Sequence, residues 1–317
     1  MLRRQIIALS LALIAQAGTL APAAFAAPAK TRIVPAWSAK IKVPHRAWIP
    51  INKPREVLLC VHGLGFSSES YNEFGSTMAG HGFAVYAVDV RGFGAWLKKR
   101  EGNLVDFESC LTDIESALKN LRKAYPGTPI FLVGESMGGA IALRAVSRYP
   151  DLVDGLISSV PSSERYANWS TQLKVGLKYI EDKDKPVNIG TTVVERATAN
   201  KALQKKLENE KTNRMEISPK ELKQFNEFMK GNYDAAALIE KTPVLMLAGF
   251  KDKLVKPEGT IDLFNGLTTQ DKLLMVVGDG EHLLLEENQL TDQLSGMLNV
   301  WIRNQSRSPN PGVTAHP

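Results

Sequence analysis

"FLVGESMGGAIAL", residues 131–143, is the stretch of sequence that decides the fold. A short apolar run leads into Gly134-Glu135-Ser136-Met137-Gly138, and an apolar pattern typical of a helix follows. The chain therefore places Ser136 between two glycines where a strand changes into a helix. The pattern G-x-S-x-G in that context predicts a sharp turn that presents the serine hydroxyl at the edge of a sheet. Gly134 and Gly138 are the small residues that such a turn requires.

Short apolar runs alternate with amphipathic stretches on both sides of this turn. Most of the runs are continuously apolar, as expected of parallel strands that are covered on both faces. Strand and helix in repetition predict a layered α/β fold with a mostly parallel sheet flanked by helices. Residues 31–55 are expected to lead into it as one antiparallel hairpin. The six expected strands of the parallel part are 57–61, 83–88, 130–133, 156–160, 244–247 and 273–277.

The alternation stops between about residues 161 and 240, a segment rich in Lys, Glu, Asn and Gln. Two pieces, 192–207 and 219–230, have helical patterns. We predict an inserted helical lid, and the alternative is a disordered linker. The main domain is then 27–160 together with 241–303, and the polar segment 304–317 is expected to be a disordered tail. The apolar residues that would give the insertion a core are Trp169, Leu173, Leu177, Leu222, Phe225, Phe228, Met229 and Leu238.

The first 26 residues have the pattern of a secretory signal peptide. Arg3 and Arg4 are followed by an apolar stretch, and Ala24-Phe25-Ala26 supplies the small residues that a signal peptidase recognises. The alternative is a membrane anchor, but the apolar stretch is short for one. The sequence therefore predicts an exported protein, and it leaves open whether that protein is periplasmic or fully secreted.

Composition limits the classes of partner. The chain has 317 residues, of which 44% are hydrophobic and 23% charged, and removal of Arg3 and Arg4 lowers its net charge from +6 to +4. No dense block of Lys and Arg with interleaved aromatic residues indicates nucleic-acid binding. A charge of this size permits only weak attraction to an anionic lipid surface. Cys60 and Cys110 are expected to be buried free thiols, although export would permit a disulfide. No metal signature is present.

A serine hydroxyl becomes a strong nucleophile only when a base removes its proton and an acid orients that base. Two loops downstream of Ser136 supply candidates. Asp252 follows the apolar run 244–247, and His282 follows the run 273–277. Both lie just past the carboxyl end of an expected strand, where α/β proteins place their sites. We therefore predict a Ser136–Asp252–His282 triad.

Other acids and histidines fit these roles less well. Asp279 and Glu281 share the loop of His282, and Asp154 precedes a strand instead of following one. His62 precedes Gly63 in "VHGLG", where a histidine can organise the loop through hydrogen bonds. The remaining histidines have no supporting context, and they are His45, His81 and His316.

Attack on an acyl carbon creates an oxyanion that needs preorganised N–H donors. One donor is expected from the residue after the nucleophile, Met137. The second is expected from the loop after the strand at 57–61, where Leu64 follows His62-Gly63 and Gly65 permits a tight turn.

These motifs together resemble the α/β-hydrolase superfamily, in particular the branch of monoacylglycerol lipases and lysophospholipases, some of which are described as serine aminopeptidase-like hydrolases. The resemblance implies an α/β-hydrolase fold with a lid. It also implies cleavage of an ester with a medium or long acyl chain through an acyl-enzyme, without metal or cofactor. The stretches that carry it are "VHGLG" (61–65), "YAVDVRGFG" (86–94), "GESMGG" (134–139), "LAGFKDKLV" (247–255) and "GDGEH" (278–282).

One stretch departs from the family pattern, because Phe93 replaces a histidine and Trp96 replaces a serine. The subfamily is therefore open. The alternatives are an aminopeptidase of the same fold, a small-ester carboxylesterase, a perhydrolase or transferase, and a binding protein without activity. The oligomeric state is open as well.

Overall fold

The computed structural model describes residues 31–34, 42–98, 104–161 and 182–307. The expected signal peptide lies outside these residues, as do Trp169, Leu173 and Leu177 of the expected insertion. Residues 308–317 of the expected tail lie outside them too.

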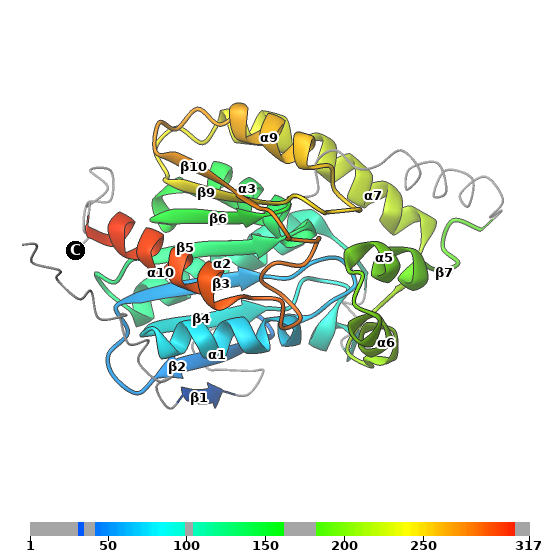
Figure 1. Ribbon diagram of the computed structural model, residues 1–317, viewed down its shortest axis with the longest axis horizontal. Coiled ribbons are helices and arrows are strands. Elements are labelled where there is room, and N and C mark those ends of the chain that lie inside the picture. The colour runs from blue at the N-terminus through cyan, green and yellow to red at the C-terminus, as the bar shows by residue number, and fades with distance from the viewer. Residues whose placement is uncertain (1–30, 35–41, 99–103, 162–181, 308–317) are drawn as a thin grey trace, which may run out of the picture.

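A single eight-stranded sheet forms the centre of the molecule (Figure 1). The strand order is β1-β2-β4-β3-β5-β6-β9-β10, in which β1 and β2 pair antiparallel and β4 onwards is parallel. This arrangement confirms the mostly parallel sheet, its six expected strands and the leading hairpin. The bounds are β1 (Thr31–Val34), β2 (His45–Pro50), β3 (Glu56–Val61), β4 (Phe83–Val88), β5 (Ile130–Glu135), β6 (Gly155–Ser159), β9 (Val244–Gly249) and β10 (Lys272–Val277).

Helices cover both faces of the sheet, as the alternating pattern requires. One face packs against α1 (Asn72–Gly80) and α10 (Asp292–Arg307). The other packs against α2 (Phe107–Ala124), α3 (Met137–Arg148) and α9 (Pro257–Asn265). Short 3-10 helices occur at η1 (Ser68–Tyr71), η2 (Gly94–Lys98) and η3 (Pro150–Leu152). The central strands β3, β4, β5, β6 and β9 are buried throughout, which explains why their sequences are mainly apolar.

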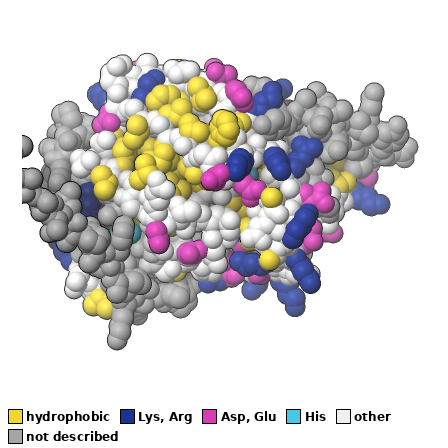
Figure 2. Space-filling view, viewed as in Figure 1, with side chains coloured by type: hydrophobic (Ala, Val, Ile, Leu, Met, Phe, Trp, Pro, Cys, Tyr) yellow, Lys and Arg dark blue, Asp and Glu magenta, His cyan; other side chains and the backbone are white. Residues whose placement is uncertain are grey.

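The edge strand β10 is less covered than its apolar sequence suggests. Leu273 and Val276 on β10 are each nearly half exposed, and Met297 and Val300 on α10 are exposed as well. Figure 2 shows hydrophobic side chains gathered over the part of the molecule where β9 and β10 lie. An edge strand has a neighbour on one side only, so its cover is incomplete.

The described part of the insertion between β6 and β9 is mainly helical and also contains one short antiparallel pair of strands, β7 and β8. The helical stretch expected at 192–207 is in fact two helices, because Asn200 interrupts it and caps the second helix by accepting the N–H groups of Ala202 and Leu203. Leu238 was expected in the core of the insertion but is 65% exposed. The described elements are β7 (Val187–Asn188), α5 (Gly190–Ala197), α6 (Lys201–Asn209), β8 (Glu216–Ile217), α7 (Pro219–Lys230) and α8 (Asn232–Ala237).

Three further expectations can be compared with the structure. Cys60 and Cys110 are buried free thiols, as predicted. Helix α10 continues to Arg307, so residues 304–307 are helical and the expected tail begins too early. None of the helices in the described ranges is long and apolar enough to cross a membrane.

Candidate active site

Ser136 lies in the sharp turn between β5 and α3 that the sequence predicts. Its backbone has φ 54° and ψ −118°, a strained conformation for a residue with a side chain. The neighbouring glycines make the turn sterically feasible. A Cβ atom at Gly134 would lie 2.2 Å from the Gly138 carbonyl oxygen, and one at Gly138 would lie 1.9 Å from the Val61 carbonyl oxygen. Both glycines are therefore required by close backbone approach.

Three side chains from separate loops meet at this turn. His282 Nε2 is 2.8 Å from Ser136 Oγ, and His282 Nδ1 is 2.8 Å from Asp252 Oδ2. Asp252 follows β9 and His282 follows β10, so adjacent parallel strands deliver them to the same edge of the sheet. The structure thus brings together the three residues that the sequence predicts to act as a unit.

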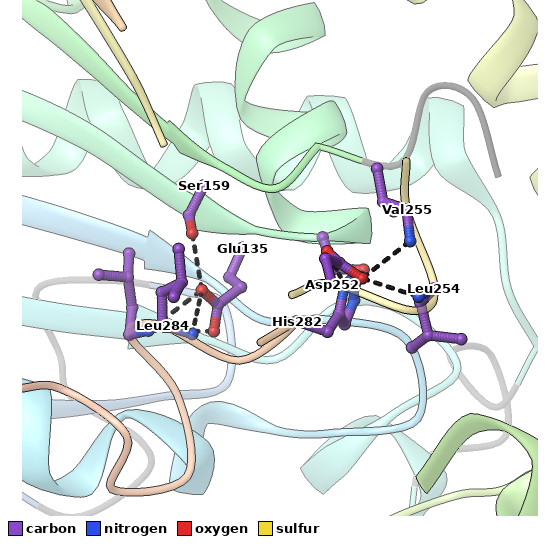
Figure 3. Close-up of polar contacts among 9 residues, drawn as sticks. Glu135, Ser159, Asp252, Leu254, Val255, His282 and Leu284 are labelled. Atoms are coloured by element: carbon purple, nitrogen blue, oxygen red, sulfur yellow. Dashed lines mark hydrogen bonds and ion pairs between the residues drawn. The ribbon is translucent and has the colours of Figure 1, made fainter. Parts of the chain in front are cut away.

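Asp252 is held so that one of its oxygens faces the histidine. The other oxygen, Oδ1, accepts the backbone N–H groups of Leu254 at 2.7 Å and Val255 at 3.0 Å (Figure 3). These bonds fix the carboxylate plane, and Oδ2 is left for the imidazole. The acid is 3% exposed and His282 is 4% exposed, so little water competes for the contact.

The electrostatic surroundings favour protonation of His282 more than burial alone would. Burial lowers the pKa of His282, whereas the charge of Asp252, its hydrogen bond and the charge of Glu135 raise it by more. The net result is a pKa above the ordinary value for histidine. An imidazolium can therefore form here as a transient species beside Ser136.

The two expected oxyanion donors, Leu64 and Met137, both lie close to Ser136. Met137 is the first residue of α3, where an N–H group has no acceptor within the helix. Leu64 lines the same hollow as Ser136. Within the described residues, no hydrogen bond occupies the N–H group of Leu64 or of Met137. Both groups are thus available to a negatively charged oxygen.

His62 organises the loop that carries Leu64, which was its expected role. Its Nδ1–H donates to the Gly63 carbonyl at 2.8 Å, and its Nε2 accepts the Val90 N–H at 3.0 Å. Burial lowers the pKa of His62, so the ring is neutral as this pattern requires. Gly65 has φ +87°, and a Cβ there would lie 2.6 Å from Met215 Sδ. Glycine is therefore required at the position after Leu64.

The residues that depart from the family pattern are structural. Phe93 is fully buried and contacts the His62 ring edge-to-face at 5.8 Å between centroids. The Trp96 indole N–H donates to the Asp89 carbonyl at 2.8 Å. Both side chains therefore pack within and around the loop after β4.

The competing acids are engaged elsewhere. Asp279 is exposed beside Lys251, and Asp154 pairs with Arg122 at 2.7 Å. Glu281 accepts the N–H group of Ala199 on the insertion. Of the other histidines, His45 bonds to the Val43 carbonyl, His81 ends α1, and His316 lies outside the described residues.

An apolar hollow opens beside Ser136 and His282. Its walls come from the main domain and from the insertion, so the insertion forms part of the site. No side chain among its described lining residues is acidic, and no group of three or more metal-binding side chains occurs in the described part of the chain. The lining residues are Gly63, Leu64, Phe66, Ser136, Val193, Ala197, Phe225, Leu254, Val255 and His282.

Two buried carboxyl groups near the site, Glu135 and Glu286, were not among the residues that the sequence predicts. Figure 3 shows Glu135 turned toward Ser159 and Leu284. In the sequence Glu135 is only the variable residue of G-x-S-x-G, and Glu286 follows an apolar run near a loop. Neither position carries a signal that would reveal their proximity.

Comparison with known proteins places this arrangement among hydrolases. The sequence pattern of the family "Serine aminopeptidase, S33" matches residues 52–289. Human monoglyceride lipase is 26% identical over 287 residues, which cover 86% of this chain and 89% of the human protein.

Two solved structures share the fold. A monoacylglycerol lipase from Paleococcus ferrophilus is 24% identical with a TM-score of 0.69, and the match covers 84% of this chain and all of that one. A soluble variant of monoglyceride lipase from Saccharomyces cerevisiae is 19% identical with a TM-score of 0.70, over 89% of this chain and 96% of that one. These similarities confirm the α/β-hydrolase fold.

Replacement of Asp252 by asparagine tests the electrostatics of the site. Asp252→Asn removes the charge that raises the pKa of His282, so that pKa should fall. An NMR titration of the labelled His282 ring measures it directly. Asp279→Asn is the matched control, because it removes an exposed acid from the same loop as His282. A His282 pKa that stays the same in Asp252→Asn would contradict the proposed arrangement of charges.

Proposed function

The chain belongs to the serine aminopeptidase S33 family, and from this membership we propose that it is a serine hydrolase that cleaves carboxylic esters. The observation that carries the proposal is the unbroken hydrogen-bonded chain from Ser136 Oγ through His282 to Asp252. That chain ends at a strained serine beside an apolar hollow. Monoglyceride lipases are the relatives that the chain resembles over most of its length, which supports an ester as substrate.

The proposed reaction proceeds through an acyl-enzyme. His282 Nε2 takes the Ser136 proton as Oγ attacks the acyl carbon, and the N–H groups of Leu64 and Met137 bind the resulting oxyanion. Collapse of this intermediate breaks the bond to the leaving alcohol, which receives the proton from His282. A water molecule then gives a proton to His282 and attacks the acyl-enzyme. The second intermediate releases the acid and returns the proton to Ser136.

Asp252 acts in this scheme as the group that orients His282 and stabilises its cationic form. The base is the neutral imidazole of His282. The rate should therefore be low at pH values below the pKa of His282 and should rise as the pH passes through that pKa. Because the surrounding charges raise that pKa, the loss of activity on acidification begins at a higher pH than it would for an ordinary histidine.

The proposed substrate is a monoacylglycerol, a lysophospholipid or a similar ester with a medium or long acyl chain. The hollow beside Ser136 is lined almost wholly by apolar side chains, which suits an acyl group. An aminopeptidase would need a carboxylate to hold the free amino terminus of a peptide. None of the described lining residues supplies one, so the ester is favoured over the peptide.

We propose that the insertion is a lid for this hollow. Val193, Ala197 and Phe225 from the insertion form part of its wall. The insertion also contacts the loop of the proposed base, because the His282 N–H donates to the Ala197 carbonyl at 3.3 Å. A lid in this position would shape the acyl site and affect the placement of His282 together.

We propose from the first 26 residues that the protein is exported. We also propose that the exported protein contacts lipid surfaces weakly. The measurement is the N-terminal sequence of full-length protein expressed in a bacterial host and recovered from its periplasm or medium. Cleavage after Ala26 should leave Ala27 as the first residue. Ala26→Trp, which puts a large side chain at the cleavage site, should block this processing. Protein that stays inside the cell with its first 26 residues attached would overturn the proposal.

The ester reaction can be tested with p-nitrophenyl esters from acetate to palmitate. Wild type should hydrolyse them with an optimum at medium or long chains, because the hollow is apolar. Ser136→Ala should lower kcat by about 10³- to 10⁶-fold while the protein stays folded. Activity on acetate and butyrate alone would indicate a small-ester carboxylesterase. A folded wild-type protein that is inert on every ester would refute the proposed function.

Phe225 and Phe228 provide a matched pair for the acyl site. Both lie on α7, both are buried and both contact Phe107, but only Phe225 lines the hollow. Phe→Ala at either position should destabilise the fold by about 3–5 kcal/mol. Phe225→Ala should also shift the optimum of acyl-chain length upward. For each additional methylene of the acyl chain that becomes buried, kcat/KM should increase by up to about fourfold. Equal profiles for the two variants would place the acyl group elsewhere.

A further inference from the structure

Two fully buried carboxyl groups, Glu135 and Glu286, lie close to the candidate site but do not line the hollow beside Ser136. Glu135 is the last residue of β5 and directly precedes Ser136. Glu286 lies four residues after His282. The reaction proposed above uses neither of them. Buried acids are expensive unless they are well paired, so each needs a physical explanation.

Glu135 is surrounded by donors. Its oxygens accept the Ser159 hydroxyl at 2.7 Å and the backbone N–H groups of Leu284 at 3.0 Å and Glu286 at 2.9 Å. The Leu285 N–H contacts both oxygens, at 3.1 and 3.2 Å. Because every partner donates, Glu135 has no need of a proton of its own. Burial raises the pKa of Glu135, and the hydrogen bonds from Ser159, Leu284 and Glu286 oppose that rise. The donors on both oxygens make Glu135 the member of the pair that is better suited to carry the charge.

Glu286 has the opposite surroundings. Its Oε1 accepts the Gly63 N–H at 2.9 Å, whereas Oε2 has no hydrogen-bond partner among the described residues. Burial and the negative charges of Glu135 and Glu287 raise the pKa of Glu286 well above its usual range. The Gly63 N–H and the Tyr71 hydroxyl oppose this rise only in part. Two neighbouring buried carboxyl groups cannot both ionise cheaply, so the proton lies on Glu286.

We propose that Glu135, ionised, and Glu286, neutral, are positioning residues. They hold three segments together: the turn that carries Ser136, the loop that carries His282, and the loop after β3 that carries Leu64. Glu135 binds the backbone of the His282 loop, and Glu286 on that loop binds the backbone of Gly63. Gly63 directly precedes Leu64, the proposed oxyanion donor. The inference rests on the proposed function, because it concerns how that reaction is positioned.

The pair also has an electrostatic consequence for His282. The titratable groups that affect the His282 pKa are Asp252 and Glu135. Those that affect Glu286 include Glu135, Glu287 and Tyr71. Removal of the Glu135 charge should therefore lower the His282 pKa, while a neutral Glu286 should contribute little to it.

The first test is Glu135→Gln. Glutamine has one acceptor oxygen, so some of the four donors lose their partner and the His282 loop shifts. We expect kcat to fall by about tenfold to a hundredfold with little change in KM, since small misplacements of catalytic groups are costly. In the pH profile of kcat/KM, the acid limb, where activity is lost on acidification, should move to lower pH. A purely structural role would not move that limb in this direction.

The same substitution at Glu286 should behave differently. Glu286→Gln keeps a neutral side chain with an oxygen for the Gly63 N–H, whereas Glu286→Ala leaves that N–H unpaired. Glu286→Gln should therefore retain about tenfold more activity than Glu286→Ala. It should also leave the acid limb closer to wild type than Glu135→Gln does. Equal losses in the two Glu286 variants would overturn the assignment of the proton.

Glu56→Gln is the matched control, because Glu56 is a buried acid at the opposite end of the sheet, where β3 begins. It should alter stability but leave kcat/KM within about twofold of wild type. If Glu135→Gln does not fold, infrared spectroscopy at neutral pH replaces it. A carbonyl band of a protonated carboxyl group should be present in wild type and absent in Glu286→Gln, and a missing wild-type band would overturn the proposal.

Labelling of Ser136 by a fluorophosphonate separates this inference from the proposed function. Wild type that neither labels nor hydrolyses esters would refute the function itself. Wild type that labels, beside a Glu135→Gln variant with the same labelling rate and the same acid limb, would overturn only the positioning role. The expected result is that Glu135→Gln labels more slowly than wild type and has a displaced acid limb, whereas Glu56→Gln labels at the wild-type rate.

Discussion

The close approach of three backbone segments at Gly134 and Gly138 is the constraint on which the site depends. No side chain fits between β5 and α3 at Gly134, or between α3 and the end of β3 at Gly138. Contact at this distance fixes the first turn of α3 against the loop that follows β3. Met137, which begins α3, and the loop with Leu64 are thereby both held close to Ser136. A bulkier residue at either glycine would separate the two halves of this cavity as well as move the serine.

The parallel sheet supplies the rest of the arrangement. Strands β9 and β10 run in register from Val244 beside Lys272 to Gly249 beside Val277, so their following loops start at the same level. Asp252 is fixed by a turn within its own loop, through the N–H groups of Leu254 and Val255. His282 has no such local fixation in its side chain. Its ring is held between Asp252 and Ser136, and its loop is held by partners from distant parts of the chain.

Local patterns could be predicted from the sequence, and contacts between distant segments could not. Continuous apolar runs identified the buried strands, and the position of Asp252 and His282 after two of them was enough to predict that they meet Ser136. The break between α5 and α6 depends on one capping residue, Asn200, inside an otherwise helical pattern. The exposure of Leu238 and the helical residues 304–307 depend on packing that apolar periodicity does not specify. Glu135 and Glu286 are about 150 positions apart, and only the folded loop makes them neighbours.

The His282 loop explains why a carboxyl group is buried next to Ser136. Leu284, Leu285 and Glu286 direct three consecutive N–H groups toward one carboxyl group, which a strand would not do because its successive N–H groups point to opposite sides. An apolar residue at position 135 would leave these groups unpaired, at about 1–3 kcal/mol for each. Glu135 is therefore the acceptor that stabilises this irregular loop beside Ser136.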